Sequence, residues 1–243
     1  MERQKAIEIR GLTKVYKNQR GIRDIDLDVY EGDIFALLGP NGAGKTTAMK
    51  IMTGMMAPDA GDIRIFGHSI RTDFEKALAP VGCIVETASH YNYLTAADNL
   101  RVVARFYGLQ DPARIDQVLE ITGIRKYKNE KVSAFSLGMK QRLGIAAAIL
   151  PHPRLLVLDE PLNGLDVEGM VEMRNLIKGL AASENTTFFI SSHLVHDVER
   201  TCDRIGVLLD GRMVGVSNTA DILRDHATLE SFFMSEVDRH GKL

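Results

Sequence analysis

Apolar and acidic residues alternate along Asp24 to Val29, near the start of the chain. A period of two is typical of a strand with one buried face, so this segment and Ala6 to Ile9 predict strands of an antiparallel sheet. Residues 62–66 and 81–85 come after turn signals and predict a further strand pair. Asp33 to Leu38 is mostly apolar and predicts a short buried strand.

The hydrophobic period lengthens to three and four residues between Tyr91 and Leu150, which predicts a helical insertion. Strand and helix patterns then alternate, and this alternation predicts a parallel sheet. The segments concerned are Leu155 to Leu158, Val167 to Ala181, Thr187 to Ile190 and Val195 to Thr201. Asp210 and Gly211 give a hairpin signal between two further strands, Ile205 to Leu209 and Met213 to Val216.

These patterns predict an α/β fold with a mainly parallel sheet, an N-terminal antiparallel β subdomain and an inserted α-helical subdomain. We expect a single domain over residues 1–221. Its core would comprise about residues 1–90 and 151–221, the helical insertion about 91–150, and residues 222–243 would form a polar C-terminal tail.

The composition is that of an ordinary globular protein: 243 residues, 45% hydrophobic and 26% charged, with 30 Lys and Arg against 32 Asp and Glu. This charge balance argues against a nucleic-acid partner. Cys83 and Cys202 lie far apart and predict neither a disulfide framework nor a zinc site, so we expect a reducing setting. The first ten residues lack the apolar region of a secretory signal, and each apolar run is shorter than the roughly 20 residues that span a bilayer.

The segment GPNGAGKT, Gly39 to Thr46, matches the phosphate-loop pattern G-x-x-x-x-G-K-[ST] between a predicted buried strand and a helix. Glycines let backbone N–H groups surround a phosphate, Lys45 would neutralise the β- and γ-phosphates, and Thr46 would bind Mg²⁺. An ordinary glycine-rich turn is the alternative, which the strand and helix around the loop disfavour. The pattern predicts a P-loop NTPase core of the RecA-like type. The residues expected to hold the nucleotide here are Gly39, Pro40, Asn41, Gly42, Ala43, Gly44, Lys45, Thr46 and Thr47.

Two adjacent carboxylates, Asp159 and Glu160, follow the apolar strand LLVL, and the carboxyl ends of parallel strands are where open α/β sheets bind ligands. We expect Asp159 to face the metal. Glu160 is the candidate general base, because a carboxylate beside the γ-phosphate would orient and deprotonate water. An acidic helix N-cap is the alternative. The sequence has no Asn-Lys dipeptide, so a guanine-reading segment of the GTPase type is not indicated.

The segment AFSLGMKQR, residues 134–142, lies ahead of Asp159 and Glu160, and with it the chain resembles the ATP-binding cassette (ABC) ATPases, the nucleotide-binding subunits of ABC transporters. The resemblance extends from Ile7 to about Asp221. Ser136 and Gly138 match the signature positions of that family, whereas Leu137 replaces a glycine and Met139 the usual glutamine. Ser136 is also expected to cap the helix that follows it.

The resemblance implies a dimer in which Ser136 and Gly138 of one subunit contact the γ-phosphate held by Lys45 of the other. It implies that Tyr16 stacks on adenine, with a surface tyrosine as the alternative, and that His193 contacts the γ-phosphate. The segment Asn163 to Asp166 would cross the dimer interface, although Asp166 also has the place of a helix cap. A metal site of His193, His196 and Asp197 is disfavoured, because no further ligand cluster accompanies them.

One position departs from the family pattern, since Glu86 stands where most members have a glutamine that binds Mg²⁺. A carboxylate can still coordinate Mg²⁺ but adds negative charge near the triphosphate. Glu86 and the residues after it resemble the exporters of bacitracin and lantibiotic resistance. Tyr91 and Tyr93 are candidates for contact with a membrane subunit or for local packing.

The resemblance implies an ATP-hydrolysing subunit that uses ATP and Mg²⁺ and works as a homodimer or with a paired ATPase subunit. It would drive a separately encoded, multi-span membrane permease from the cytoplasmic face of the cell membrane, exporting a peptide antibiotic, drug or similar compound. One alternative is a soluble ABC ATPase that acts without a permease. Another is a nucleotide sensor without hydrolysis, which the presence of both Lys45 and Glu160 disfavours.

Overall fold

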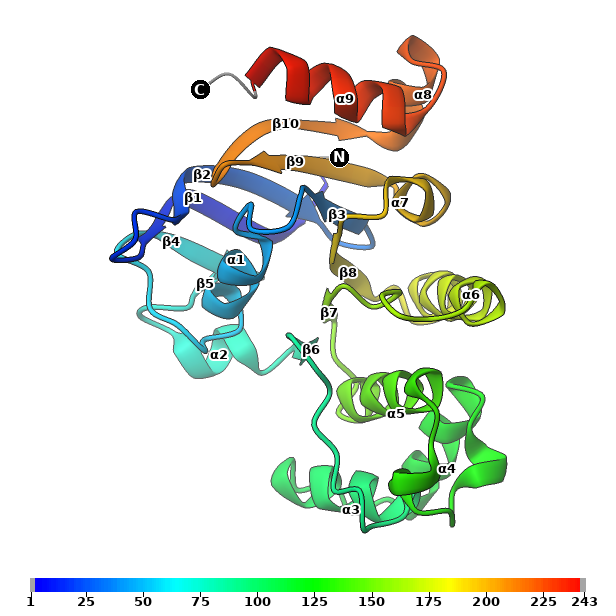
Figure 1. The fold of residues 1–243 in the computed structure, drawn as a ribbon. Coiled ribbons are helices and arrows are strands. Elements are labelled where there is room, and N and C mark those ends of the chain that lie inside the picture. Colours follow the sequence, from blue (N-terminus) through cyan, green and yellow to red (C-terminus); the bar gives the residue numbers. More distant parts are fainter. Residues whose placement is uncertain (1–2, 241–243) are drawn as a thin grey trace.

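The computed structural model describes residues 3–240, which form two sheets. The larger sheet has the strand order β10-β9-β3-β8-β7-β6, in which β10 is antiparallel to β9 and the other neighbours are parallel (Figure 1). The α/β prediction is confirmed. The strands are β3 (Ile34–Leu38), β6 (Val81–Ile84), β7 (Leu155–Asp159), β8 (Thr187–Ser192), β9 (Arg204–Leu209) and β10 (Arg212–Asn218).

The smaller sheet is antiparallel and has the order β2-β1-β4-β5. Its strands are β1 (Lys5–Val15), β2 (Gly21–Tyr30), β4 (Ala60–Ile65) and β5 (His68–Ser69). The expected pairing of residues 62–66 with 81–85 is wrong, because β4 pairs with β1 and β6 pairs with β7. Turn signals show where a chain reverses but not which strands pair, and the partner of β6 comes from a remote part of the chain. The short helix α2 (Phe74–Leu78) precedes β6.

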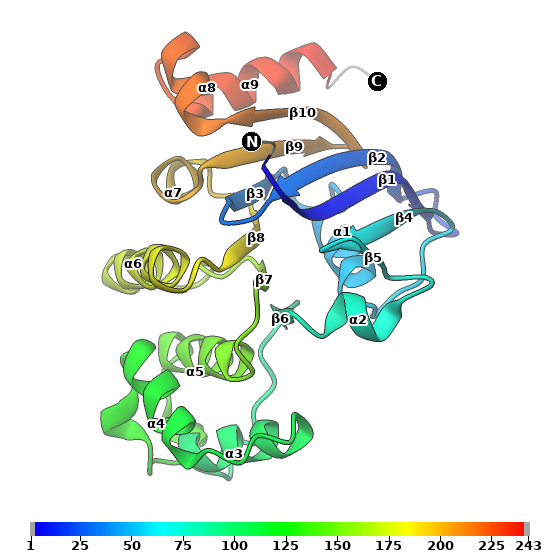
Figure 2. The ribbon, with the colours of Figure 1, turned by 180° about the vertical axis from the view of Figure 1, so that it is seen from behind.

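Helices cover one face of the larger sheet, and the antiparallel sheet with α1 (Lys45–Met52) covers the other (Figures 1 and 2). Side chains alternate along β3 accordingly: Ile34, Ala36 and Leu38 join the helical core, whereas Phe35 and Leu37 join the core beneath α1. The helices on the first face are α5 (Leu137–Ile149), α6 (Val167–Glu184) and α7 (Val195–Thr201).

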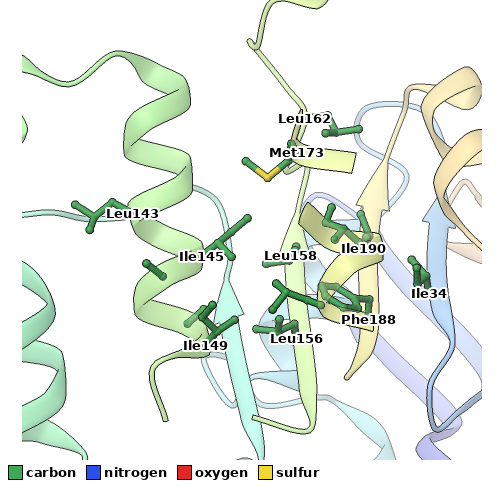
Figure 3. Packing of buried hydrophobic residues seen from close by; sticks show 14 of the residues in the cluster. Ile34, Leu143, Ile145, Ile149, Leu156, Leu158, Leu162, Met173, Phe188 and Ile190 are labelled. Atoms are coloured by element: carbon green, nitrogen blue, oxygen red, sulfur yellow. The ribbon is translucent and has the colours of Figure 1, made fainter. Parts of the chain in front are cut away.

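The helical insertion lies at the β6 end of the sheet (Figure 2). Besides α5 it contains α3 (Ala96–Phe106), α4 (Pro112–Ile121) and the short turns η1 (Arg125–Tyr127) and η2 (Val132–Ala134). Ile145 and Ile149 of α5 pack against Leu156 and Leu158 of β7 (Figure 3). Burial of such side chains stabilises the fold by about 1.5–3 kcal/mol each, so α5 is anchored to the sheet that carries the two carboxylates.

The C-terminal residues differ from the expected polar tail. They form α8 (Thr219–Asp225) and α9 (Leu229–His240), and α9 packs against α7 and β9. Leu229 is fully buried, and Phe232, Phe233 and Val237 pack against the core at helical spacing. Within residues 3–240, we find no helix with the length and apolar character that a membrane crossing requires.

Candidate functional site

The phosphate loop joins β3 to α1, and its glycines allow close backbone packing. A Cβ at Gly39 would lie 2.3 Å from the carbonyl oxygen of Leu208, and one at Gly44 would lie 2.4 Å from Cγ2 of Ile22. Gly42 and Gly44 have φ of +84° and +108°, a region that side chains disfavour. The loop therefore requires glycine where the motif places it, directly ahead of α1, whose N-terminus is an environment that favours an anion.

Lys45 is buried within this loop, with an exposed side-chain fraction of 6%. Its Nζ donates to the carbonyl oxygen of Gly39 at 2.8 Å and lies 3.4 Å from Oε1 of Glu160. A buried ammonium among backbone amides is a strong electrostatic site for phosphate oxygens. The loop and the general-base candidate thus face one another.

The side chains of Thr46 and Asp159 form a hydrogen-bonded pair next to the phosphate loop. Oγ1 of Thr46 donates to Oδ2 of Asp159 at 2.9 Å, and Ser191 donates to the other carboxylate oxygen. A hydroxyl and a buried carboxylate are the hard oxygen donors that Mg²⁺ prefers, so these residues fit that ion. One groove contains this pair, lined by Asn41, Gly42, Gly44, Lys45, Thr46, Thr47, Glu86, Asp159, Glu160 and Asn163.

Glu86 lines the same groove, but its carboxylate is paired with Lys50 of α1. This hydrogen bond raises the pKa of Lys50 above its ordinary value. The backbone N–H of Glu86 points the other way, toward Oδ2 of Asp159 at 3.4 Å. The main chain of Glu86 therefore lies against Asp159, while its carboxylate, a predicted Mg²⁺ ligand, is paired with Lys50. Binding of Mg²⁺ by Glu86 stays a prediction.

Glu160 adopts a left-handed backbone conformation with φ of 49°, directly after β7. For a residue other than glycine such a conformation costs on the order of 1–3 kcal/mol. Its N–H donates to Oγ of Ser191 at 2.9 Å, and its Oε2 lies 2.9 Å from Nδ1 of His193. This backbone conformation thus lets Glu160 line the same groove as Asp159, the residue before it in the chain.

Ser191 is a site residue without a predicted role in the sequence. It accepts from the backbone of Glu160 and donates to Asp159, so it orients both carboxylate residues from the end of β8. The sequence does carry a signal for Ser191: it is a polar residue at the C-terminal end of a buried strand, shortly before the predicted site residue His193.

Tyr16 lies at the end of β1, next to the start of α1. Its hydroxyl lies 3.2 Å from Oγ1 of Thr47, and its side chain is partly exposed. The structure therefore places this aromatic ring beside the phosphate loop. Its stacking on adenine stays a prediction.

Ser136 and Gly138 lie outside the phosphate-loop groove. They line a second groove together with Gly164, Leu165 and Asp166, where α5 and α6 begin. Oγ of Ser136 accepts from the N–H of Met139 at 3.3 Å and so caps α5. Oδ1 of Asp166 accepts from the N–H of Gly169 at 2.9 Å and caps α6. The structure thus joins Lys45, Thr46, Asp159, Glu160 and His193 in one site and separates Ser136 and Gly138 from it.

His196 and Asp197 do not join His193. Asp197 is paired with Arg174 of α6, and His196 is exposed on α7. The arrangement gives His193 the carboxylate of Glu160 as its polar neighbour.

Comparison with known proteins gives matches over most of the chain. The ABC transporter family matches residues 22–163. The bacitracin transport ATP-binding protein BcrA of Bacillus licheniformis is 44% identical over 208 residues, which cover 86% of this chain and 68% of that protein. The lantibiotic transport ATP-binding protein SrtF of Streptococcus pyogenes is 39% identical over 209 residues, covering 86% and 89% respectively.

Solved structures agree on the fold. One, described as the ATP binding subunit of an ABC transporter, has a TM-score of 0.83 at 29% identity and covers 96% of this chain and 99% of its own. Another is cbiO1 from Clostridium perfringens, part of the ABC transporter complex cbiONQ, with a TM-score of 0.82 at 23% identity over 98% of this chain and 96% of its own. The second likeness concerns the fold alone.

Proposed function

We propose that this chain hydrolyses ATP to drive a separately encoded membrane permease. The premise is that the chain belongs to the ABC transporter family and is an ATP-binding subunit of that type. The observation that carries the proposal is the position of Glu160. Its carboxylate lies between Lys45 and His193, next to the Thr46 and Asp159 pair.

In the proposed reaction the loop amides and Lys45 bind the β- and γ-phosphates of ATP. Thr46 and Asp159 would hold Mg²⁺, which when bound supplies positive charge to the phosphate oxygens. Glu160 accepts a proton from a water molecule as the water oxygen bonds to the γ-phosphorus and the bond to ADP breaks. His193 holds the carboxylate of Glu160 and would contact the γ-phosphate.

We propose a head-to-tail dimer for the working state. Ser136 and Gly138 lie at the N-terminus of α5, where the helix dipole favours an anion. Their groove is separate from the phosphate loop of the same chain. A second copy would bring its γ-phosphate to this groove, and two MgATP would then lie between the subunits.

The names of the relatives support the proposed cargo. BcrA is named for bacitracin transport and SrtF for lantibiotic transport, so we propose export of a peptide antibiotic, drug or similar compound. The chain would then be peripheral at the cytoplasmic face of the membrane, held there by the permease.

A comparison of wild type with Glu160→Gln tests the proposal. Without any membrane protein, we expect wild type to hydrolyse MgATP and Glu160→Gln to be slower by at least about 100-fold, because an amide cannot accept the proton. With ATP, Glu160→Gln should elute from size exclusion at twice the monomer mass. Glu184→Gln, at the exposed end of α6, is the matched control and should behave as wild type.

Two results would contradict parts of the proposal. Equal hydrolysis by Glu160→Gln and wild type would show that Glu160 is not the base. Wild type that binds ATP without turnover would favour the nucleotide sensor.

A further inference from the structure

Gly211 belongs to the β9–β10 turn and lies between the phosphate loop and the start of β2. Its N–H donates to the carbonyl oxygen of Ala43 in the phosphate loop at 3.1 Å. Its carbonyl oxygen accepts from the N–H of Arg23 in β2 at 2.8 Å. One residue of the β9–β10 turn is therefore bonded to the phosphate loop and to the antiparallel sheet at once.

The packing around this junction leaves no room for a Cβ at Gly211. A Cβ at Gly211 would lie 2.1 Å from the carbonyl oxygen of Gly21, and a Cβ at Gly44 would lie 3.4 Å from the same oxygen. The peptide that follows Gly21 is thus packed between the phosphate loop and the β9–β10 turn. Gly211 also has a φ of +77°, so glycine is required there for both its conformation and its contacts.

The junction extends to Tyr16 through the turn between β1 and β2. The N–H of Tyr16 donates to the carbonyl oxygen of Arg20 at 2.8 Å, which ties the tyrosine to the residue before Gly21. Its hydroxyl lies beside Thr47, as described above. A backbone path of short contacts therefore runs from Tyr16 through Gly21 and Gly211 to Ala43.

We infer that Gly211 is a positioning residue that fixes the spacing between Tyr16 and the phosphate loop. The inference rests on the proposed binding of ATP, whose adenine and triphosphate would engage these two sites together. A ligand that must satisfy two sites gains affinity when their spacing is preset, and a shift of one site loses that gain. A ligand that engages the phosphate loop alone is insensitive to the spacing.

The chain offers a matched control for the substitution Gly211→Ala. The β4–β5 turn has φ of 46° at Phe66 and 83° at Gly67, and the β9–β10 turn has 46° at Asp210 and 77° at Gly211. Apart from its two chain neighbours, no atom of the described residues lies within 4 Å of a Cβ built at Gly67. Gly67→Ala therefore imposes the same backbone strain without the contact.

The experiment measures dissociation constants of MgATP and of magnesium tripolyphosphate by calorimetry for wild type, Gly211→Ala and Gly67→Ala. We expect Gly211→Ala to weaken ATP binding about tenfold and tripolyphosphate binding by less than about threefold, with both unchanged in Gly67→Ala. Equal weakening of both ligands would overturn the inference, because Gly211 would then support the loop alone. Equal effects of the two glycine substitutions would also overturn it.

Two further outcomes have a different meaning. If wild type fails to bind ATP, the proposed function fails, and the inference falls with it. If Gly211→Ala shows no cooperative thermal unfolding, Arg23→Pro replaces it, because proline removes the N–H that bonds to Gly211. The same difference between ATP and tripolyphosphate is expected, and its absence would overturn the inference.

Discussion

Nδ1 of His193 lies 2.9 Å from Oε2 of Glu160. Glu160 directly follows β7 and His193 directly follows β8, and these two strands are paired. Adjacent parallel strands thus deliver a carboxylate and an imidazole to the same edge of the sheet. Because His193 holds the carboxylate that we propose as base, its loss should affect turnover more than binding.

His193→Ala is expected to slow hydrolysis at saturating MgATP by about 100-fold while the dissociation constant of ATP changes little. Steady-state hydrolysis and equilibrium binding measure the two effects. His196→Ala is the control, since it removes the same side chain from an exposed position of α7. A His193→Ala protein with wild-type turnover would exclude a role for this contact in hydrolysis.

Thr46→Val tests the predicted metal pair. Valine keeps the shape of threonine but lacks the hydroxyl that donates to Asp159 at 2.9 Å. We expect ATP binding to lose most of its dependence on Mg²⁺, measured as the ratio of ATP dissociation constants with and without the ion. Thr53→Val is the control, because the hydroxyl of Thr53 bonds to the backbone of α1 at Met49. An unchanged ratio in Thr46→Val would contradict the assignment.

Glu86→Gln removes one negative charge from the phosphate-loop groove and breaks the pair with Lys50. Without Mg²⁺, the variant should bind ATP about fivefold more tightly, since repulsion of the triphosphate falls and Lys50 becomes free to attract it. Titration with ATP in a chelator measures this, and Glu31→Gln, which breaks a pair with Arg154, is the control. Weaker binding by Glu86→Gln without metal would contradict the electrostatic argument.

His90 predicts a dependence of stability on pH. Burial lowers the pKa of His90 below its ordinary value of 6.5, although its bond to the carbonyl oxygen of Lys140 opposes this. Below about pH 6.5 the unfolded chain therefore binds more protons at this residue than the folded chain, and the free energy of unfolding falls as the pH decreases.

Urea unfolding at pH 7.5, 6.5 and 5.5 gives this dependence, and His90→Gln should lose less stability across the series than wild type does. The exposed His196 supplies the comparison, because His196→Gln should follow the wild-type curve. A His90→Gln curve parallel to that of wild type would show that other groups cause the acid sensitivity.

Arg114 predicts a structural effect far from the site. Its side chain is buried in α4, and its guanidinium donates to the carbonyl oxygens of Ile149 and Leu150 at the end of α5. Arg114→Met should lower the free energy of unfolding by about 1.5–3 kcal/mol, because bonds from a charged donor are lost. Urea unfolding measures this against Arg105→Met, which changes an exposed arginine of α3. Equal stability of the two variants would refute the assigned role.

The sequence predicts those parts of the fold whose signal is local. The resemblance to ABC ATPases is confirmed, and α7 spans the same residues that the alternation of strand and helix patterns indicated, from Val195 to Thr201. The partners of β4 and β6 could not be predicted, because residues remote in the chain supply the opposing strands. The same holds for the site: the motifs locate Lys45 and Asp159, whereas a contact such as that of Gly211 with Ala43 depends on tertiary packing.

The place of β3 has a consequence for synthesis on the ribosome. This strand carries the phosphate loop and pairs with β8 and β9, which are made only after the helical insertion. Contacts between residues so distant in the chain form slowly and late. The N-terminal half of the protein therefore emerges without the strands that flank β3, and the nucleotide site is completed only when the β9–β10 turn with Gly211 has left the exit tunnel.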